Sequence, residues 1–257
     1  MSQSQGPIPF AKGAAACAAA LALTSPGLAL AQQQQRPQPA PPPVQGLYST
    51  SSAAARYSTP DGAVRFVFDR SSGGRAALVR FEDDPEVHIL RPYMAAGGGE
   101  IYRTEDGDVM LRVTPHGGII VYTRALRTGA PASEEEEVAP LAPVSLAFAE
   151  MQRRFQVLQS YARRRLGQPV TFSAPDQVSA PAAGVVVDAA ERAAEGLAAA
   201  PMTTVRRVII TFGQTPAVAQ RGDTLIVQVA PHLGYAGRPS SNTIRNVVTG
   251  SVQGPEQ

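Results

Sequence analysis

The sequence has very few of the side chains that carry covalent and redox chemistry. Among 257 residues there are one cysteine, three histidines and no tryptophan. Cys17 falls within a segment that we interpret below as a cleaved leader, so the processed chain has no thiol. This excludes disulfides, thiolate catalysis and cysteine-based metal sites. Lys12, the only lysine, falls within the same segment, which excludes a lysine base of the Ser-x-x-Lys kind.

The sequence also lacks a strong charge of either sign. Its 23 basic residues are balanced by 21 acidic ones. This balance does not fit a protein that binds polyanions over its whole surface. The length suffices for one ordinary domain or two small ones, with a core that needs no crosslinks.

The first 31 residues have the layout of a secretory signal peptide. A polar start with Lys12 precedes an apolar run over 13–23, and Ala29-Leu30-Ala31 places small residues where a signal peptidase cleaves. Pro26-Gly27 interrupts the run before it reaches the roughly 20 residues of a membrane span. We predict cleavage after Ala31, a periplasmic location and no transmembrane span in the mature chain.

The N-terminal half of the remaining chain is expected to be rich in β-strands. Residues 32–58, rich in glutamine, proline, alanine and serine, are typical of a disordered linker. Over 59–128, short apolar runs with a period of two are separated by glycine-containing turns, which predicts an antiparallel meander. Residues 129–143 contain four consecutive glutamates, Glu134–Glu137, and are expected to form a solvated acidic connector because like charges repel.

Residues 144–232 are expected to mix helices and strands. An apolar stripe at spacings of three or four predicts a helix over 144–166; it consists of Phe148, Met151, Phe155, Leu158 and Ala162. A strand near 169–172, a second helix over 183–199 and two strands follow, and we expect these two strands, 208–212 and 225–229, to pair as a hairpin. The tail, 233–257, is rich in glycine, proline and serine, with a short helix near its middle.

The fold class predicted from these patterns is α+β. It consists of an N-terminal antiparallel β-meander followed by a helix-strand-helix-strand-strand C-terminal half.

No motif supports catalytic or cofactor-binding residues, and two segments remain as candidate binding sites. Asp83, Asp84, Glu86 and His88 bring carboxylates close to an imidazole and are candidate metal ligands. A solvated acidic turn after a strand is the alternative. Arg238, Ser240 and Ser241 are candidate anion-binding residues, because an arginine beside two hydroxyls at a helix start can receive a carboxylate or phosphate. A helix cap is the alternative there.

Two further patterns favour structural roles. Gly97-Gly98-Gly99 precedes a strand and not a helix, so it predicts a turn rather than a phosphate cradle. The arginines of the helix over 144–166 are spread around it at about 100° per residue. They indicate a solvated helix rather than a lipid or nucleic-acid surface.

Several segments resemble a known family: Phe66-Val67-Phe68-Asp69-Arg70, residues 77–87, Met110-Leu111-Arg112-Val113 and residues 234–241. With these, the chain resembles an uncharacterised family of exported alphaproteobacterial proteins, known as a domain of unknown function. The resemblance implies no activity, cofactor or site residue.

We therefore expect an exported periplasmic protein that works by binding, without a cofactor. Its partner would be an envelope protein or a small ligand, not a nucleic acid. One alternative is a small enzyme with Glu82, Asp83, His88 and His116 in a pocket between the two halves. Another is an oligomeric structural protein that pairs through the helix over 144–166.

Overall fold

The computed structural model describes residues 53–72 and 76–251, which belong to one compact unit. The expected signal peptide with its cleavage site at Ala31, the linker as far as residue 52, Gly73-Gly74 of an expected hairpin turn and the last residues of the tail lie outside the described residues.

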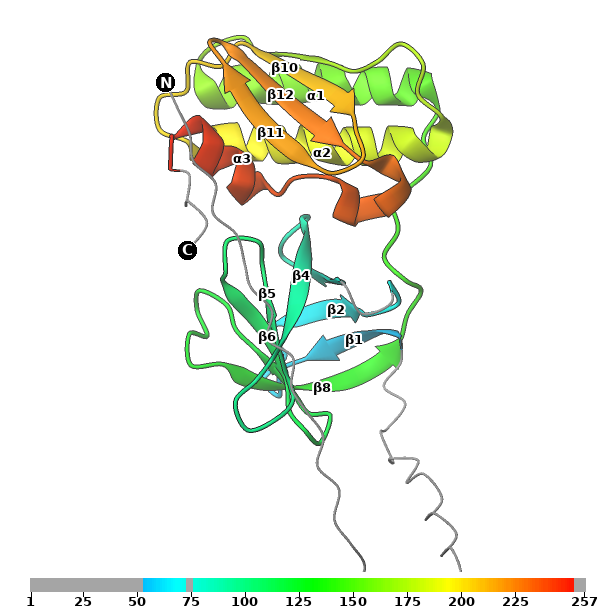
Figure 1. The fold of residues 1–257 in the computed structure, drawn as a ribbon, viewed down its shortest axis with the longest axis vertical. Helices are drawn as coiled ribbons and strands as arrows, with labels where there is room; N and C mark the ends of the chain where they lie inside the picture. Colours follow the sequence, from blue (N-terminus) through cyan, green and yellow to red (C-terminus); the bar gives the residue numbers. More distant parts are fainter. Residues whose placement is uncertain (1–52, 73–75, 252–257) are drawn as a thin grey trace, which may run out of the picture. The chain divides into compact units, whose positions relative to one another are not determined.

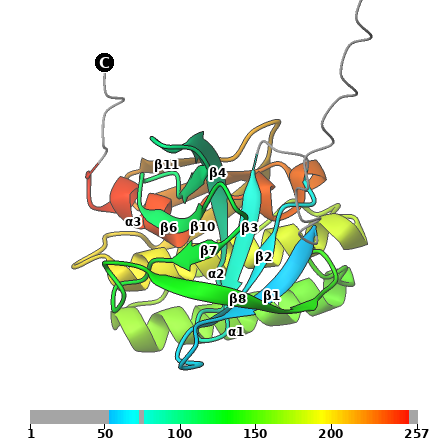
Figure 2. The ribbon, with the colours of Figure 1, turned by 90° about the horizontal axis from the view of Figure 1, so that it is seen from below.

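The N-terminal part is a closed antiparallel barrel of eight strands. Each strand pairs with the next, and β8 lies beside β1 and closes the barrel (Figure 2). The strands are β1 (Ala54–Ser58), β2 (Arg65–Asp69), β3 (Ala77–Phe81), β4 (Val87–Met94), β5 (Glu100–Arg103), β6 (Val109–Val113), β7 (Ile119–Val121) and β8 (Ala130–Glu137).

The alternating apolar residues of these strands fill the barrel interior. Tyr57 stacks on Phe66 with ring centroids 5.6 Å apart, and Phe68 meets Tyr102 edge-on at 5.0 Å. Leu90 and Leu111 are fully buried beside them. An eight-stranded barrel has an interior just wide enough for side chains, so these aromatic rings form its core.

The predicted β-meander is wrong, because the barrel is closed by two strands that the sequence patterns did not indicate. β1 lies at the end of the stretch assigned to the linker, and β8 occupies most of the expected acidic connector. The glutamates of β8 are exposed, and Glu136 pairs with Arg56 while Glu135 lies 4.0 Å from Arg65. Cross-strand arginines thus relieve the repulsion that suggested a solvated loop.

The C-terminal part is a four-stranded sheet with helices. Its sheet order is β11-β12-β10-β9, and α1 and α2 cover one face (Figure 1). The elements are α1 (Phe148–Leu166), β9 (Thr171–Ser173), α2 (Ala180–Ala199), β10 (Arg207–Phe212), β11 (Ala217–Arg221), β12 (Thr224–Val229), the 3-10 helix η1 (Pro231–Gly237) and α3 (Ser241–Val248).

The expected hairpin between residues 208–212 and 225–229 is also wrong. β10 and β12 are parallel neighbours, and β9 pairs parallel with β10 on the other side. The segment between β10 and β12, expected to be a loop, contains β11, which pairs antiparallel with β12. β11 returns the chain to the starting edge, so β12 runs in the same direction as β10.

The helix expected over 144–166 is present as α1, and its stripe packs within the same chain. Met151, Phe155 and Ala162 are buried in a core shared with α2 and the sheet. Pairing of this stripe with a second copy would require that core to open. None of the helices in 53–72 and 76–251 has the length and apolar character that a membrane span requires.

One glycine of α2 permits a close approach that a larger residue would block. A Cβ atom built on Gly184 would lie 2.0 Å from the carbonyl oxygen of Val144. The segment that leads into α1 therefore crosses α2 at van der Waals distance from its backbone.

Candidate functional site

The acidic turn between β3 and β4 sends its carboxylates in different directions. Asp84 Oδ1 accepts a hydrogen bond from the Glu86 amide at 2.8 Å, and Asp84 Oδ2 lies 2.9 Å from His88 Nε2. The hydrogen bond with His88 lowers the pKa of Asp84 despite its partial burial. Asp83 is exposed, whereas Glu86 is buried. The four candidate metal ligands therefore do not converge on one point.

Glu86 is directed toward the C-terminal part of the chain. Its carboxylate accepts hydrogen bonds from the amide of Ser241 at 3.1 Å and from the Ser241 hydroxyl. Arg238 Nη1 donates to the same carboxylate at 3.4 Å. Glu86 also sits before the first turn of α3, where free amides favour a negative charge.

Arg238 is fully buried and is held from three sides. Its Nε donates to Asp188 of α2, and its Nη2 donates to the carbonyl oxygen of Val87 at 2.7 Å. Together with Glu86, these contacts tie β4 of the barrel to α2 and to the start of α3. We call Glu86, Asp188, Arg192, Glu195, Arg238 and Ser241 the ionic joint.

Arg192 is the second buried cation of the ionic joint. Its guanidinium lies 2.9 Å from Glu195 and 3.8 Å from each of Glu86, Asp188 and Glu191. Its Nε and Nη1 donate no well-aligned hydrogen bond to any described residue. Two arginines thus face four carboxylates.

Burial raises the pKa of Glu195 to about 7, with Arg192 opposing the shift and Glu86 adding to it. Burial and Asp188 likewise raise the pKa of Glu191.

The start of α3 is held by a second acidic turn of the barrel. Asp106, between β5 and β6, accepts hydrogen bonds from the side-chain amides of Asn242 and Asn246 at 2.6 and 3.0 Å. Ser240 caps α3, accepting a hydrogen bond from the Thr243 amide at 3.0 Å. Carboxylates from two barrel turns therefore contact α3: Glu86 accepts from its first backbone amide, and Asp106 accepts from two of its side chains.

The two candidate sites from the sequence thus face each other. The carboxylate that contacts Arg238 and Ser241 is Glu86, which belongs to the same chain. Within residues 53–72 and 76–251, no three His, Cys, Asp or Glu side chains are grouped so as to hold a metal ion. Binding of an external metal or anion by these residues stays a prediction.

The residues of the alternative enzyme site are dispersed. His88 contacts Asp84 near the barrel end, whereas His116 is exposed in the turn between β6 and β7. Glu82 and Asp83 are exposed on the β3–β4 turn. In the described part of the chain, no hydrogen bond or ion pair joins any two of these four side chains.

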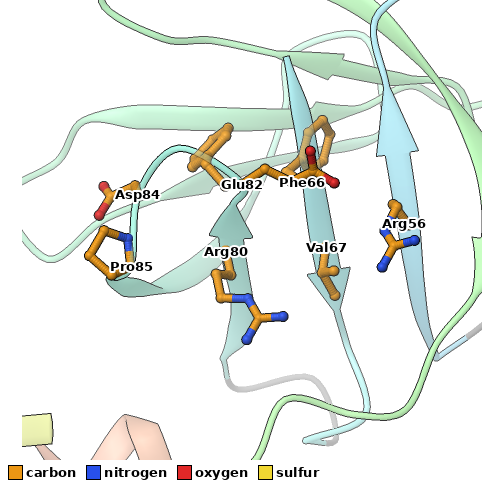
Figure 3. Close-up of a pocket in the computed structure, with 8 residues that line it drawn as sticks. Arg56, Phe66, Val67, Arg80, Glu82, Asp84 and Pro85 are labelled. Carbon is orange, nitrogen blue, oxygen red and sulfur yellow. The ribbon is translucent and has the colours of Figure 1, made fainter. Parts of the chain in front are cut away.

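A shallow hollow of about 290 Å³ lies on the outer wall of the barrel. Arg56 and Arg80 flank Val67 on three neighbouring strands (Figure 3). Arg56 already pairs with Glu136 of β8. The hollow therefore offers one exposed arginine, Arg80, beside a small apolar floor.

A larger charged surface lies where α1 and α2 end and the parallel strands begin. Because α1 leads into β9 and α2 into β10, both helices end at the edge where β9, β10 and β12 start, and β11 ends there too. Six exposed arginines lie on these segments. We call them the arginine edge: Arg163, Arg164, Arg165, Arg206, Arg207 and Arg221.

Hydrogen bonds between the loops fix this edge. Gln168 donates to the carbonyl of Thr203 at 2.9 Å, and Gln220 donates to Thr204 at 3.3 Å. The amides of Arg206 and Arg207 both donate to the carbonyl of Asp223, at 2.7 and 3.1 Å. The α1–β9 loop, the α2–β10 loop and the end of β11 with the β11–β12 turn are therefore tied together.

The arginine edge carries an excess of five positive charges. Asp223 is the one acidic residue in the segments 163–171, 198–207 and 220–224. It pairs with Arg207 at 2.9 Å, and this hydrogen bond lowers the pKa of Asp223. The other five arginines form no ion pair within the described residues. The pattern of α1 alone does not predict this surface, because half of its arginines come from the α2–β10 loop, β10 and β11.

The fold and site define a class of protein in which a closed antiparallel barrel and a two-layer α/β part are joined by buried ion pairs. The chain belongs to a family described as a domain of unknown function (DUF4908), whose pattern matches residues 43–248. No curated protein and no solved structure is significantly similar to it.

Proposed function

We propose that the protein is an exported binding module of an alphaproteobacterial cell envelope. It works by binding rather than by catalysis, and its binding surface is the arginine edge. The observation that carries this proposal is the gathering of six exposed arginines against a single acid at one edge. Such a surface attracts a negatively charged partner and orients its approach.

The rest of the structure supports this use of the edge. Arg238, the arginine that the sequence suggested for anion binding, and Arg192 are both buried among carboxylates of the same chain. The arginines of the edge, in contrast, are held on a fixed framework and face solvent. Arginine suits phosphate and carboxylate partners because its planar group donates two parallel hydrogen bonds.

Retention on immobilised heparin, used as a polyanion probe, tests the binding surface. We expect the wild-type chain to elute at higher salt than R163Q/R164Q/R165Q. The matched control is R91Q/R124Q/R127Q, which removes the same charge from exposed barrel positions and is expected to elute with the wild type. Equal loss of retention in both triple variants would contradict a localised site.

Fractionation tests the export. Expressed with residues 1–31 in a Gram-negative host, the chain is expected in the periplasmic fraction with Gln32 as its new N-terminus. The variant L21R/L23R, which places charges in the apolar run, is expected to stay in the cytosol unprocessed. A wild-type chain recovered full-length from the cytosol would refute export.

A further inference from the structure

We infer that the partner of the arginine edge is the surface of an anionic phospholipid bilayer, to which the protein attaches peripherally. This inference rests on the binding surface proposed above and names its partner.

The edge is broad rather than enclosed. Arg207 of β10 and Arg221 of β11 both lie opposite Thr224 of β12, so they stand about 10 Å apart, two strand spacings across the sheet. Arg163, Arg164 and Arg165 lie on the helix layer behind that sheet. Positive charge spread over two layers matches an extended anionic plane better than a single small ligand.

Met202 is an exposed apolar residue that lines the same hollow as Arg165 of this charged surface. It lies in the α2–β10 loop, the residue is 97% exposed, and its φ of 54° is the one left-handed value among the described non-glycine residues. An exposed methionine in a strained turn gains nothing within the chain. An apolar side chain among basic residues is the pattern by which proteins insert into the boundary between headgroups and acyl chains.

A hollow next to Met202 gives the surface room for a headgroup. It measures about 540 Å³ and is lined by Arg165, Gln168, Thr203 and Thr204 beside Met202. The guanidinium of Arg165 and the hydroxyls of the two threonines offer hydrogen-bond donors of the kind that phosphate accepts.

A purely structural role accounts for only part of this arrangement. Arg163, Arg164 and Arg165 complement the negative end of the α1 dipole. That role explains neither Arg206 and Arg221, which come from a loop and a strand, nor the exposure of Met202. The bilayer explains all three features together.

Flotation with vesicles tests the inference. The full chain is mixed with vesicles of equal parts phosphatidylglycerol and phosphatidylcholine, or of phosphatidylcholine alone. We expect binding to the anionic vesicles only, and its loss at high salt. Since each arginine near an anionic surface contributes about fivefold in partition coefficient, R163Q/R164Q/R165Q is expected to lose on the order of 100-fold. The control R91Q/R124Q/R127Q is expected to bind as the wild type does.

The apolar contribution is tested separately. M202S is expected to lower the partition coefficient about tenfold without removing the salt dependence. The matched control is M94S, at a methionine that is 79% exposed on the barrel, and it is expected to have no effect. Equal effects of M202S and M94S would overturn the role of Met202.

The outcomes separate this inference from the proposed function. Retention on heparin that depends on the arginine edge, without binding to anionic vesicles, overturns the bilayer and leaves a soluble polyanion or an acidic protein as the partner. Absence of both overturns the binding surface itself. Vesicle binding that R91Q/R124Q/R127Q weakens as much as R163Q/R164Q/R165Q overturns the assignment to this edge.

Discussion

Substitution of Arg238 by methionine is the sharpest test of the ionic joint. Methionine keeps an unbranched side chain of similar reach but removes the charge and every donor. The change deletes the hydrogen bonds to Asp188, Glu86 and the carbonyl of Val87. It leaves Glu86, which is 4% exposed, with Arg192 at 3.8 Å as its remaining cation.

The expected loss is large because the carboxylates stay buried. Removal of one partner from a buried ion pair costs about 3–5 kcal/mol of unfolding free energy, and a domain has only about 5–15 kcal/mol in total. Glu86→Gln is expected to cost less, about 1–2 kcal/mol. It neutralises one of the four carboxylates that face two arginines, and its amide oxygen still accepts from the Ser241 amide.

Equilibrium urea denaturation, followed by circular dichroism, measures both losses. Arg127→Met, at an exposed position of the barrel, is the control and is expected to stay within about 0.5 kcal/mol of the wild type. A loss below about 1 kcal/mol for Arg238→Met, or a greater loss for Glu86→Gln than for Arg238→Met, would refute the reasoning that carboxylates are in excess.

Three further predictions concern the α/β part. Since the folded-state pKa of Glu195 is about 7, above its ordinary 4.5, the folded chain binds this proton more tightly than the unfolded chain, and stability falls as pH rises between these values. We expect about 1 kcal/mol, less than the full shift implies because the side chain is 35% exposed; an equal slope in Glu195→Gln would contradict this. Gly184→Ala is expected to destabilise by about 1–3 kcal/mol through overpacking against Val144, and an unchanged melting temperature would show that the crossing can shift. Phe155→Ala is expected to cost about 3–5 kcal/mol in urea denaturation, whereas a loss below about 1 kcal/mol would mean that α1 contributes little to the core.

The sequence predicted best those elements whose pattern is local. Phe66 and Phe68 lie two positions apart between Arg65 and Asp69 and form β2, and the spacing of Met151 and Phe155 follows the buried face of α1. In both cases one face of the element packs into an apolar core. The spacing of the apolar side chains along the sequence then distinguishes a strand from a helix.

Elements stabilised by distant partners were missed. Half of the residues of β8 are exposed glutamates, and its apolar residues Ala130 and Ala132 pack against the barrel core. Nothing local distinguishes such a strand from a charged loop, because its stability comes from hydrogen bonds to β1 and β7 and from Arg56.

The candidate residues were found as two separate groups for the same reason. Glu86 and Arg238 were each singled out by their neighbours in the sequence, but their contact joins residues 152 positions apart. The acidic turn suggested a metal and the arginine-serine segment suggested an anion. In the folded chain each group supplies the partner of the other, because Glu86 binds Arg238 and Ser241.

The closure of the barrel has a consequence for the order in which the chain folds. β1 is among the first described residues, and its closing contact, from Arg56 to Glu136, spans 80 positions. Contacts between residues so far apart in sequence form slowly, since the entropy of a long loop is lost before they are gained. During synthesis, β1 has no closing neighbour until β8 has emerged. The barrel therefore cannot close until nearly all of its strands have been synthesised, although its sequential strand pairs are free to form earlier.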